Sequence, residues 1–444
     1  MGRKFFGTDG VRGRVGQTPM TADFALRLAG AAARVLVPDG GSVVIGKDTR
    51  VSGYMFEAAL EAGFTAAGVD VLMLGPLPTP GVAHITRKFD ADLGVMISAS
   101  HNPFYDNGIK FFDGNGSKLS DEVELKIEAL LQAPSLTRES SELGFAKRID
   151  SARQLYIEYC LNSVDPSMTL DGMKIVLDCS NGAAFKIAPR VLSALGANVI
   201  PIGCSPNGRN INEGCGSTQP ELLCQTVRGV NADLGIALDG DGDRVLMVDA
   251  DGNIVDGDQL IYIVAMGRYR VGELKGPVVG TVMSNLGLER KLGEQGIDFV
   301  RAKVGDRYVM AELKKHEGVI GGETSGHIIC LDRATTGDGM VSALQLLEII
   351  RGSGKSLSEL AAEMPLYPQV LINVKVAERF DVDSNTAISE ARAAIEQRLG
   401  DRGRIVLRAS GTEPLIRVMV EGLDQPEVQA AAEELANAVK EVAA

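Results

Sequence analysis

Three segments of the sequence repeat one pattern, in which an apolar strand, a polar loop, a helix and a glycine lead to a second strand. The first strands are expected at 43–46, 174–178 and 277–280, the helices near 53–68, 184–195 and 288–295, and the return strands at 69–73, 196–200 and 296–300. This order of elements requires a parallel or mixed sheet with helices packed against it. Three such units at roughly regular separation indicate three related α/β domains.

The segment after residue 368 has a different pattern. Strands are expected at 370–376, 404–407 and 415–420, and helices at 385–399 and 426–442. This order predicts a small α+β domain. The expected domains cover residues 1–150, 151–252, 253–367 and 368–444. The predicted fold class is therefore α/β, with three related mixed-sheet domains and a C-terminal α+β domain around a central cleft.

The net charge limits which partners the chain can bind, and the cysteines indicate the cellular compartment in which it works. The 444 residues carry a net charge of −13, which argues against nucleic acid or an anionic membrane as a partner. An anionic ligand would therefore need a local group of arginines and lysines. The six cysteines form no CxxC pair, and no targeting or membrane-spanning segment is expected. The sequence thus predicts a cytoplasmic protein with reduced thiols.

A short apolar run at 93–97 predicts a buried strand that ends in a polar loop, residues 98–103 (Ser-Ala-Ser-His-Asn-Pro). The proline keeps the preceding residue out of helix, so the chain turns or stays extended there. A hydroxyl is thereby placed beside an imidazole at the end of a rigid strand, where a sheet protein would hold a nucleophile. Taken alone, however, the pattern is more typical of an ordinary polar loop at the end of a strand, with no chemical role.

A second loop, residues 239–244 (Asp-Gly-Asp-Gly-Asp-Arg), lies between two apolar runs. Its glycines let Asp239, Asp241 and Asp243 converge, which suits a hard divalent cation. A calcium-binding EF-hand is disfavoured because arginine and alanine occupy its sixth and twelfth positions. Three aspartates leave coordination positions open, which fits Mg²⁺ shared with a substrate phosphate.

Two further loops carry hydrogen-bonding groups. Residues 321–327 (Gly-Gly-Glu-Thr-Ser-Gly-His) suit sugar hydroxyls, although a plain polar hairpin is an equally good interpretation. Residues 408–414 (Arg-Ala-Ser-Gly-Thr-Glu-Pro) combine hydroxyls, backbone donors and a planar guanidinium, as a phosphate cradle does. A match to the phosphate-binding P-loop at 41–47 fails, because Asp48 stands where that motif needs serine or threonine.

These four loops, in this order, resemble the motifs of the α-D-phosphohexomutase superfamily, one in each expected domain. Residues 6–13 (Phe-Gly-Thr-Asp-Gly-Val-Arg-Gly) and the last loop are most similar to bacterial phosphoglucosamine mutases, whereas phosphomannomutase/phosphoglucomutase relatives commonly carry asparagine in place of Gly411. The resemblance implies a mutase that interconverts glucosamine 6-phosphate and glucosamine 1-phosphate through a phosphoserine and glucosamine 1,6-bisphosphate. Phosphomannomutase/phosphoglucomutase activity, a phosphatase and a non-catalytic sugar-phosphate sensor stay open as alternatives.

The resemblance also implies a role for each site residue. Ser100, next to His101, would carry the phosphoryl group, with one Mg²⁺ per chain held by that serine and by Asp239, Asp241 and Asp243. The other implied roles are sugar binding by Glu323 and Ser325, phosphate binding by Arg408, Ser410, Gly411, Thr412 and Arg417, proton transfer by Lys110 or His327, and steadying of phosphate charge by Arg12 and Arg244. The implied partner is a phosphosugar, and a homodimer, an activating kinase or autophosphorylation stay open.

Overall fold

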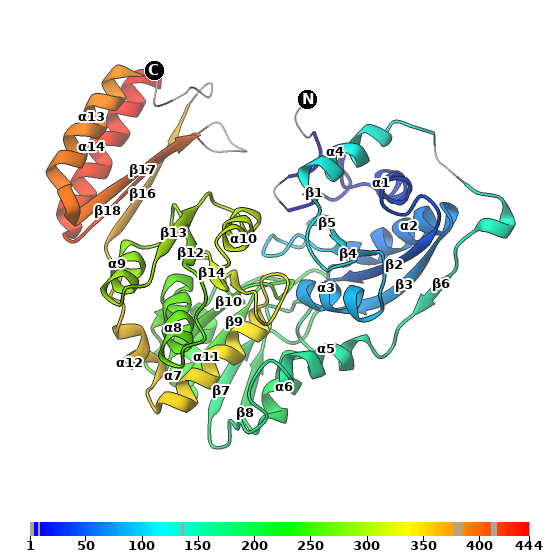
Figure 1. Cartoon of the computed structure of the whole chain (residues 1–444), viewed down its shortest axis with the longest axis horizontal. Helices are drawn as coiled ribbons and strands as arrows, with labels where there is room; N and C mark the ends of the chain where they lie inside the picture. The colour runs from blue at the N-terminus through cyan, green and yellow to red at the C-terminus, as the bar shows by residue number, and fades with distance from the viewer. Residues whose placement is uncertain are drawn as a thin grey trace.

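Four sheets follow one another along the chain and organise its helices (Figure 1). The structure, a computed structural model, describes residues 4–7, 9–134, 137–376, 380, 382, 385–409 and 415–443. Three mixed sheets come first and a smaller antiparallel sheet comes last. The predicted fold class is thereby confirmed.

The first sheet has six strands in the order β1-β5-β4-β2-β3-β6. Strands β2, β3 and β4 are parallel, as the repeat predicts, whereas β5 pairs antiparallel with both β4 and β1. Every residue of β4 is buried, as expected of a strand covered on both faces. The elements of this part are β1 (Val11–Arg14), α1 (Ala22–Leu36), β2 (Gly41–Lys47), α2 (Ser52–Ala66), β3 (Val69–Pro76), α3 (Thr79–Lys88), β4 (Leu93–Ile97), β5 (Asp106–Asp113), α4 (Asp121–Leu130), the short turn η1 (Ser140–Glu142), β6 (Ala146–Arg148) and α5 (Ala152–Leu161).

The second and third sheets repeat the parallel pairing and each adds an antiparallel hairpin. In the second sheet β7 lies parallel to β8 and β9, and β10 turns back along β9. In the third, β12 lies parallel to β13 and β14, and β15 turns back along β14. The elements are β7 (Lys174–Asp178), α6 (Ala188–Ala194), β8 (Asn198–Ile202), α7 (Glu221–Val230), β9 (Leu234–Leu238), β10 (Val245–Asp249), β11 (Ile254–Val255), α8 (Gly257–Arg270), β12 (Val278–Thr281), α9 (Leu286–Glu294), β13 (Phe299–Ala302), α10 (Asp306–Lys315), β14 (Ile320–Gly322), β15 (Ile328–Cys330), α11 (Gly339–Ser353) and α12 (Leu357–Ala362).

One helix begins later than its pattern predicts. The helix expected near residue 184 is α6, which starts at Ala188. The preceding residues form turns in which the Gly182 N–H donates to the Cys179 carbonyl and the Ala183 N–H donates to Gly240. This segment is therefore held against the 239–244 loop, a contact that periodicity along one segment cannot register.

The last part is an antiparallel sheet, β16-β18-β17, covered by two helices. Figure 1 shows it to one side of the other three sheets, with α13 and α14 on its outer face. The elements are β16 (Gln369–Lys375), α13 (Thr386–Leu399), the short turn η3 (Gly400–Arg402), β17 (Gly403–Ala409), β18 (Leu415–Gly422) and α14 (Gln425–Ala443). Within the described residues, no helix combines the length and apolar character that crossing a bilayer requires.

Apolar packing divides the chain unevenly. One core cluster runs from Val44 in the first sheet to Met364 at the end of α12, so the first three sheets share buried contacts. The last sheet has a core of its own. Its described contacts with the third sheet include polar ones, in which the Arg404 guanidinium donates to the carbonyls of Val282 and Ser284, 2.8 and 2.6 Å away. Parts with separate apolar cores move relative to each other more readily than parts that share one.

A buried carboxyl at the start of α11 makes stability depend on pH. Asp338 accepts the backbone N–H groups of Met340 and Val341, and Tyr156 donates its hydroxyl to the same carboxyl. Burial raises the pKa of Asp338 to about 6. The folded chain therefore keeps a proton that the unfolded chain releases above about pH 4. This group lowers the free energy of unfolding as pH rises from about 4 to 6, and its effect is constant above that range.

Asp338→Asn is expected to remove this pH dependence while keeping an oxygen that accepts the helix N–H groups. The unfolding temperature of the variant minus that of the unaltered chain should rise between pH 4 and 6. Thermal unfolding measured at intervals across this range checks the difference. Burial also raises the pKa of Asp256 to about 6. Asp256 titrates in both proteins, so its effect cancels in the difference between their unfolding temperatures. A constant difference across the range contradicts the assignment.

Candidate functional site

Ser100 lies just beyond β4 with its backbone in the left-handed region, at φ 53°. A residue with a side chain adopts this conformation at a cost of roughly 1–2 kcal/mol, so the surroundings must hold it there. The side chain is buried, and its Oγ donates to Asp239 Oδ2 at 2.6 Å. His101 Nδ1 lies 3.3 Å from the same Oγ. Burial, followed by the charges of Arg244 and Arg12, lowers the pKa of His101 to about 4, so this imidazole is neutral near pH 7.

Asp239, Asp241 and Asp243 converge in the hairpin between β9 and β10. One oxygen of each lies within 4.8 Å of the others, and all three side chains are buried. Residues 98–103 are named the nucleophile loop, after the role predicted for Ser100. Gly240 permits the close approach of the acidic loop to them, because a Cβ there would lie 2.5 Å from the Ser100 carbonyl oxygen.

These carboxylates fit a divalent cation. Among the described residues, Asp241 Oδ1 and Asp243 Oδ1 have no hydrogen-bond donor although both are buried. Burial and the two neighbouring carboxylates raise the pKa of Asp239, so a positive charge among these carboxylates would favour their ionised form. Oxygen ligands of this kind suit Mg²⁺.

Lysines and arginines surround the acidic loop. Lys110 Nζ, on β5, lies 2.7 Å from Asp241 Oδ2 and 2.9 Å from Asp9 Oδ2. Burial alone would lower the pKa of Lys110, but Asp241, Asp9 and Asp243 outweigh it and raise that pKa. Arg12 is close enough for Asp9 and Asp241 to act on its charge, and Arg244 follows the acidic loop directly. A chain of net charge −13 thus concentrates cations around the three aspartates.

The 321–327 segment forms a hairpin between β14 and β15 and lies against the acidic loop. The Val245 N–H donates to the Gly326 carbonyl at 3.0 Å. His327 Nδ1 lies 3.6 Å from Asp243 Oδ1, which joins the two loops. Glu323 accepts the Gly305 N–H through Oε1 at 2.9 Å, and Ser325 is exposed. The expected loop between two strands is thus present, and it is adjacent to the three aspartates.

Arg408 and Arg417 lie directly opposite each other on β17 and β18. Ser410, Gly411 and Thr412 lie outside the described residues. The structure therefore places both arginines at the base of the predicted phosphate loop. It brings Ser100, the three aspartates, Lys110 and His327 together, while the arginine pair belongs to the separate fourth sheet.

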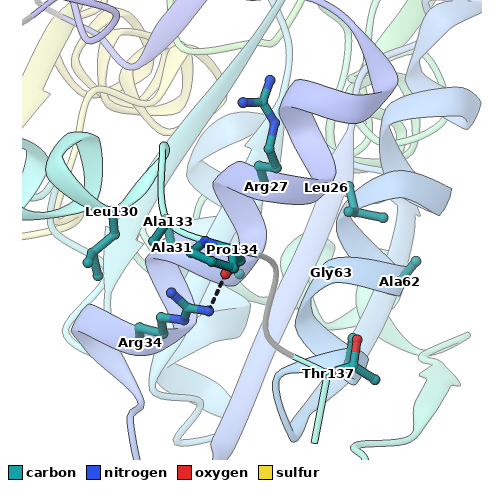
Figure 2. Close-up of a pocket in the computed structure, with 12 residues that line it drawn as sticks. Leu26, Arg27, Ala31, Arg34, Ala62, Gly63, Leu130, Ala133, Pro134 and Thr137 are labelled. Atoms are coloured by element: carbon teal, nitrogen blue, oxygen red, sulfur yellow. Dashed lines mark hydrogen bonds between the residues drawn. The ribbon is translucent and has the colours of Figure 1, made fainter.

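Two hollows of the surface lie elsewhere. A cavity of about 110 Å³ lies between α1, α2 and the segment after α4, where Arg34 donates to the Pro134 carbonyl at 2.6 Å (Figure 2). A larger one of about 650 Å³ lies beside α8 and α11. Neither is lined by any of the sequence-predicted site residues.

Several polar residues of this region were not predicted from the sequence. Lys118 pairs with both Asp9 and Asp306, and Asp306 Oδ2 lies 3.4 Å from His327 Nε2. Arg50 lies beneath the nucleophile loop and is fully buried. They lie on different elements, far apart in the sequence, so no local motif connects them. Arg50 and Lys118 stand in polar segments, so the local sequence does not distinguish them from ordinary surface cations.

The chain matches all four domains of one family. The matches are to phosphoglucomutase/phosphomannomutase alpha/beta/alpha domains I, II and III at residues 3–138, 154–252 and 256–367, and to the C-terminal domain at 371–438. The chain therefore belongs to the phosphoglucomutase/phosphomannomutase family.

Relatives of known name match over the whole length. A phosphoglucosamine mutase of Methylobacillus flagellatus is 57% identical over 452 residues, covering 100% of both chains. One of Thiobacillus denitrificans is 56% identical over 452 residues, covering 100% of this chain and 99% of its own. The resemblance stated from the motifs is thereby confirmed.

Solved structures share the fold. A phosphoglucomutase/phosphomannomutase family protein of Burkholderia thailandensis superposes with a TM-score of 0.83 at 24% identity, covering 98% of this chain and 97% of its own. An N-acetylphosphoglucosamine mutase of Aspergillus fumigatus, solved with GlcNAc-6P and magnesium, superposes with a TM-score of 0.70 at 19% identity. The match covers 99% of this chain and 96% of the fungal chain.

Proposed function

We propose that this chain interconverts glucosamine 6-phosphate and glucosamine 1-phosphate, as an intramolecular phosphotransferase of the isomerase class. The observation that carries the proposal is the placement of Ser100 Oγ, 2.6 Å from Asp239 in a buried group of three aspartates. A phosphoserine there would be strongly repelled without a divalent ion and cations, and Lys110 lies 2.7 Å from Asp241. The amino-sugar substrate is supported by the full-length relatives named phosphoglucosamine mutase.

The proposed cycle moves one phosphoryl group at a time. Phosphorylated Ser100 donates its phosphoryl group to O1 of glucosamine 6-phosphate, so a P–O1 bond forms as the P–Oγ bond breaks. The O1 proton passes by way of Lys110 or His327, both beside the aspartates, to Ser100 Oγ, which becomes a hydroxyl. The resulting 1,6-bisphosphate turns end for end. The Ser100 hydroxyl then takes back the phosphoryl group from O6, its proton passes by the same route to O6, and glucosamine 1-phosphate leaves.

The surrounding residues position this transfer. Phosphoryl transfer depends mainly on positioning and charge neutralisation. Bound by Asp239, Asp241 and Asp243, Mg²⁺ supplies positive charge to the phosphoryl oxygens beside Ser100. Arg12 and Arg244 steady phosphate charge, and Glu323 and Ser325 hold sugar hydroxyls.

The non-reacting phosphate is assigned to Arg408, Arg417 and residues 410–412. Like charges directly opposite on neighbouring strands destabilise the pair. Burial and the charge of Arg417 lower the pKa of Arg408. A bound phosphate relieves this repulsion, which favours an anion between the two strands. Because either phosphate of the bisphosphate occupies this position in turn, movement of the fourth sheet would let the intermediate turn without escaping.

Arg408→Gln is expected to raise KM for both substrates by roughly 10- to 100-fold, because one charged hydrogen-bonding partner of the phosphate is lost. The effect on kcat should be smaller. Steady-state kinetics in both directions of the reaction measures the changes in KM and kcat separately. Arg402→Gln is the matched control, since Arg402 is an exposed arginine of the same domain paired with Glu427. An unchanged KM in Arg408→Gln contradicts the assignment.

A parallel assay tests the substrate. Glucosamine 1-phosphate, glucose 1-phosphate and mannose 1-phosphate are supplied separately, each with a catalytic amount of the matching bisphosphate. The proposal predicts fastest turnover of the amino sugar. Faster turnover of glucose or mannose phosphate would make the chain a phosphoglucomutase or phosphomannomutase. Release of free phosphate in place of isomer would indicate a phosphatase, and binding without turnover a sensor.

The remaining assignments belong to the same proposal. Each expected domain contributes one loop, with divisions at residues 1–150, 151–252, 253–367 and 368–444. The partner is a phosphosugar, and Ser100 is first phosphorylated by a kinase or by the chain itself. The proposal also includes assembly of two chains into a homodimer and a location in the cytoplasm.

A further inference from the structure

Arg50, in the link between β2 and α2, is a fully buried arginine that binds the nucleophile loop. Its guanidinium donates to the Ser100 carbonyl at 2.9 Å, to Asn102 at 2.8 Å and to Asp106 at 3.1 Å, and also to Pro103. The carbonyls of Ser100, Asn102 and Pro103 lie in the loop between β4 and β5, and Asp106 is the first residue of β5. A buried carbonyl group such as that of Ser100 needs a hydrogen-bond partner, and Arg50 supplies donors to four carbonyls of this short segment.

Asp48 balances the charge of this arginine and extends the contact to the peptide nitrogen of the nucleophile. Arg50 Nε donates to Asp48 Oδ2 at 2.7 Å, with both side chains fully buried. Ser98 Oγ donates to the same carboxylate oxygen at 2.6 Å and accepts the Ser100 N–H at 2.9 Å. Ser100 is thus held at its nitrogen through Ser98 and at its carbonyl by Arg50.

Asn212, between β8 and α7, holds the same loop from the second sheet. Its Nδ2 donates to the Ser100 carbonyl at 2.9 Å and to the Asn102 carbonyl at 3.1 Å. Arg50 Nη2 donates to the same two oxygens. Two side chains from different sheets therefore fix the left-handed backbone of Ser100, while the second sheet also carries the aspartates.

We propose that Arg50 is a positioning residue for Ser100, and that Arg50 and Asn212 together clamp the Ser100 and Asn102 carbonyls so that Ser100 Oγ faces Asp239. The inference rests on the proposed function, in which Ser100 carries the phosphoryl group. Arg50 acts through the backbone of the loop, because its charge is already paired with Asp48. A displacement of about 1 Å at a reacting atom lowers the rate by about 10²-fold.

Arg50→Lys in the full-length chain tests the clamp. Lysine keeps the charge opposite Asp48 but has three donors in place of five, so it cannot hold the four carbonyls. We expect kcat to fall by about 10²-fold with KM for the sugar phosphate unchanged. The matched control is Arg268→Lys, another buried arginine, paired with Glu273 and Asp332 beside the 650 Å³ cavity. It should lower the unfolding temperature and leave kcat unchanged.

A double-mutant cycle separates positioning from general loss of structure. Because Arg50 and Asn212 hold the same oxygens, the kcat loss of Arg50→Lys combined with Asn212→Ala should differ from the product of the single losses by about tenfold. Asn212→Ala alone tests the clamp should Arg50→Lys fail to fold. An unchanged kcat in folded single variants, strictly multiplicative losses, or a loss confined to KM overturns the inference. Full turnover by Ser100→Ala would instead overturn the proposed function.

Discussion

Ser100→Ala is expected to lower kcat by at least about 10⁴-fold, because the hydroxyl that carries the phosphoryl group is removed. The neighbouring hydroxyl of Ser98 offers no replacement, since Ser98 Oγ is engaged with Asp48 and the Ser100 N–H. Substrate binding should survive, because the proposed sugar and phosphate contacts lie on other loops. Isomer formation measured with bisphosphate present, beside calorimetric binding of the sugar phosphate, checks both expectations.

A matched control for this substitution is Ser163→Ala. Ser163 is also buried, and its hydroxyl donates to the Cys160 carbonyl near the end of α5. Its replacement should leave kcat unchanged. Turnover by Ser100→Ala within about tenfold of the unaltered chain would remove the nucleophile assignment, since loss of a nucleophile has a far larger effect.

Removal of divalent cations is the second change with a large expected effect. Treatment with a chelator should abolish turnover and added Mg²⁺ should restore it, because three buried carboxylates beside a phosphoserine repel one another without a cation. Asp241→Asn should lower kcat at fixed Mg²⁺ by about 10³-fold, which corresponds to several kcal/mol of lost charge stabilisation.

A second measurement separates metal binding from catalysis. Magnesium should raise the unfolding temperature of the unaltered chain, since a ligand that binds only the folded state stabilises it, and should have little effect on Asp241→Asn. Asp251→Asn is the control, because Asp251 is an exposed residue of the turn after β10. Full turnover of chelator-treated protein would contradict the metal assignment.

The parts of the site that follow from the sequence are those built from contiguous residues. The strand before Ser100 spans Leu93–Ile97 as expected, and the acidic loop lies between the strands predicted for it. Apolar runs fix a strand and its end locally, so the polar residues that follow are placed with it. Parallel pairing of β2 with β3, of β7 with β8 and of β12 with β13 also follows from the repeat.

The supporting residues could not be predicted in this way. In the sequence Asp48 stands out only as the residue that breaks a P-loop pattern, yet in the fold its carboxylate holds Arg50 and Ser98. Asn212 is 112 positions from Ser100 in the sequence and reaches it only because the second sheet packs against the first. Such contacts depend on tertiary packing between elements, which periodicity within one segment does not encode.

Single-turnover transfer from the phosphorylated chain tests the central claim most directly. Purified protein carrying labelled phosphate is mapped by mass spectrometry and then mixed with unlabelled glucosamine 6-phosphate. The account predicts that the label starts on Ser100 and moves to O1 of the sugar, giving glucosamine 1,6-bisphosphate as the serine loses its phosphate. Label on another residue, or label released from Ser100 as free phosphate without appearing on the sugar, would contradict it.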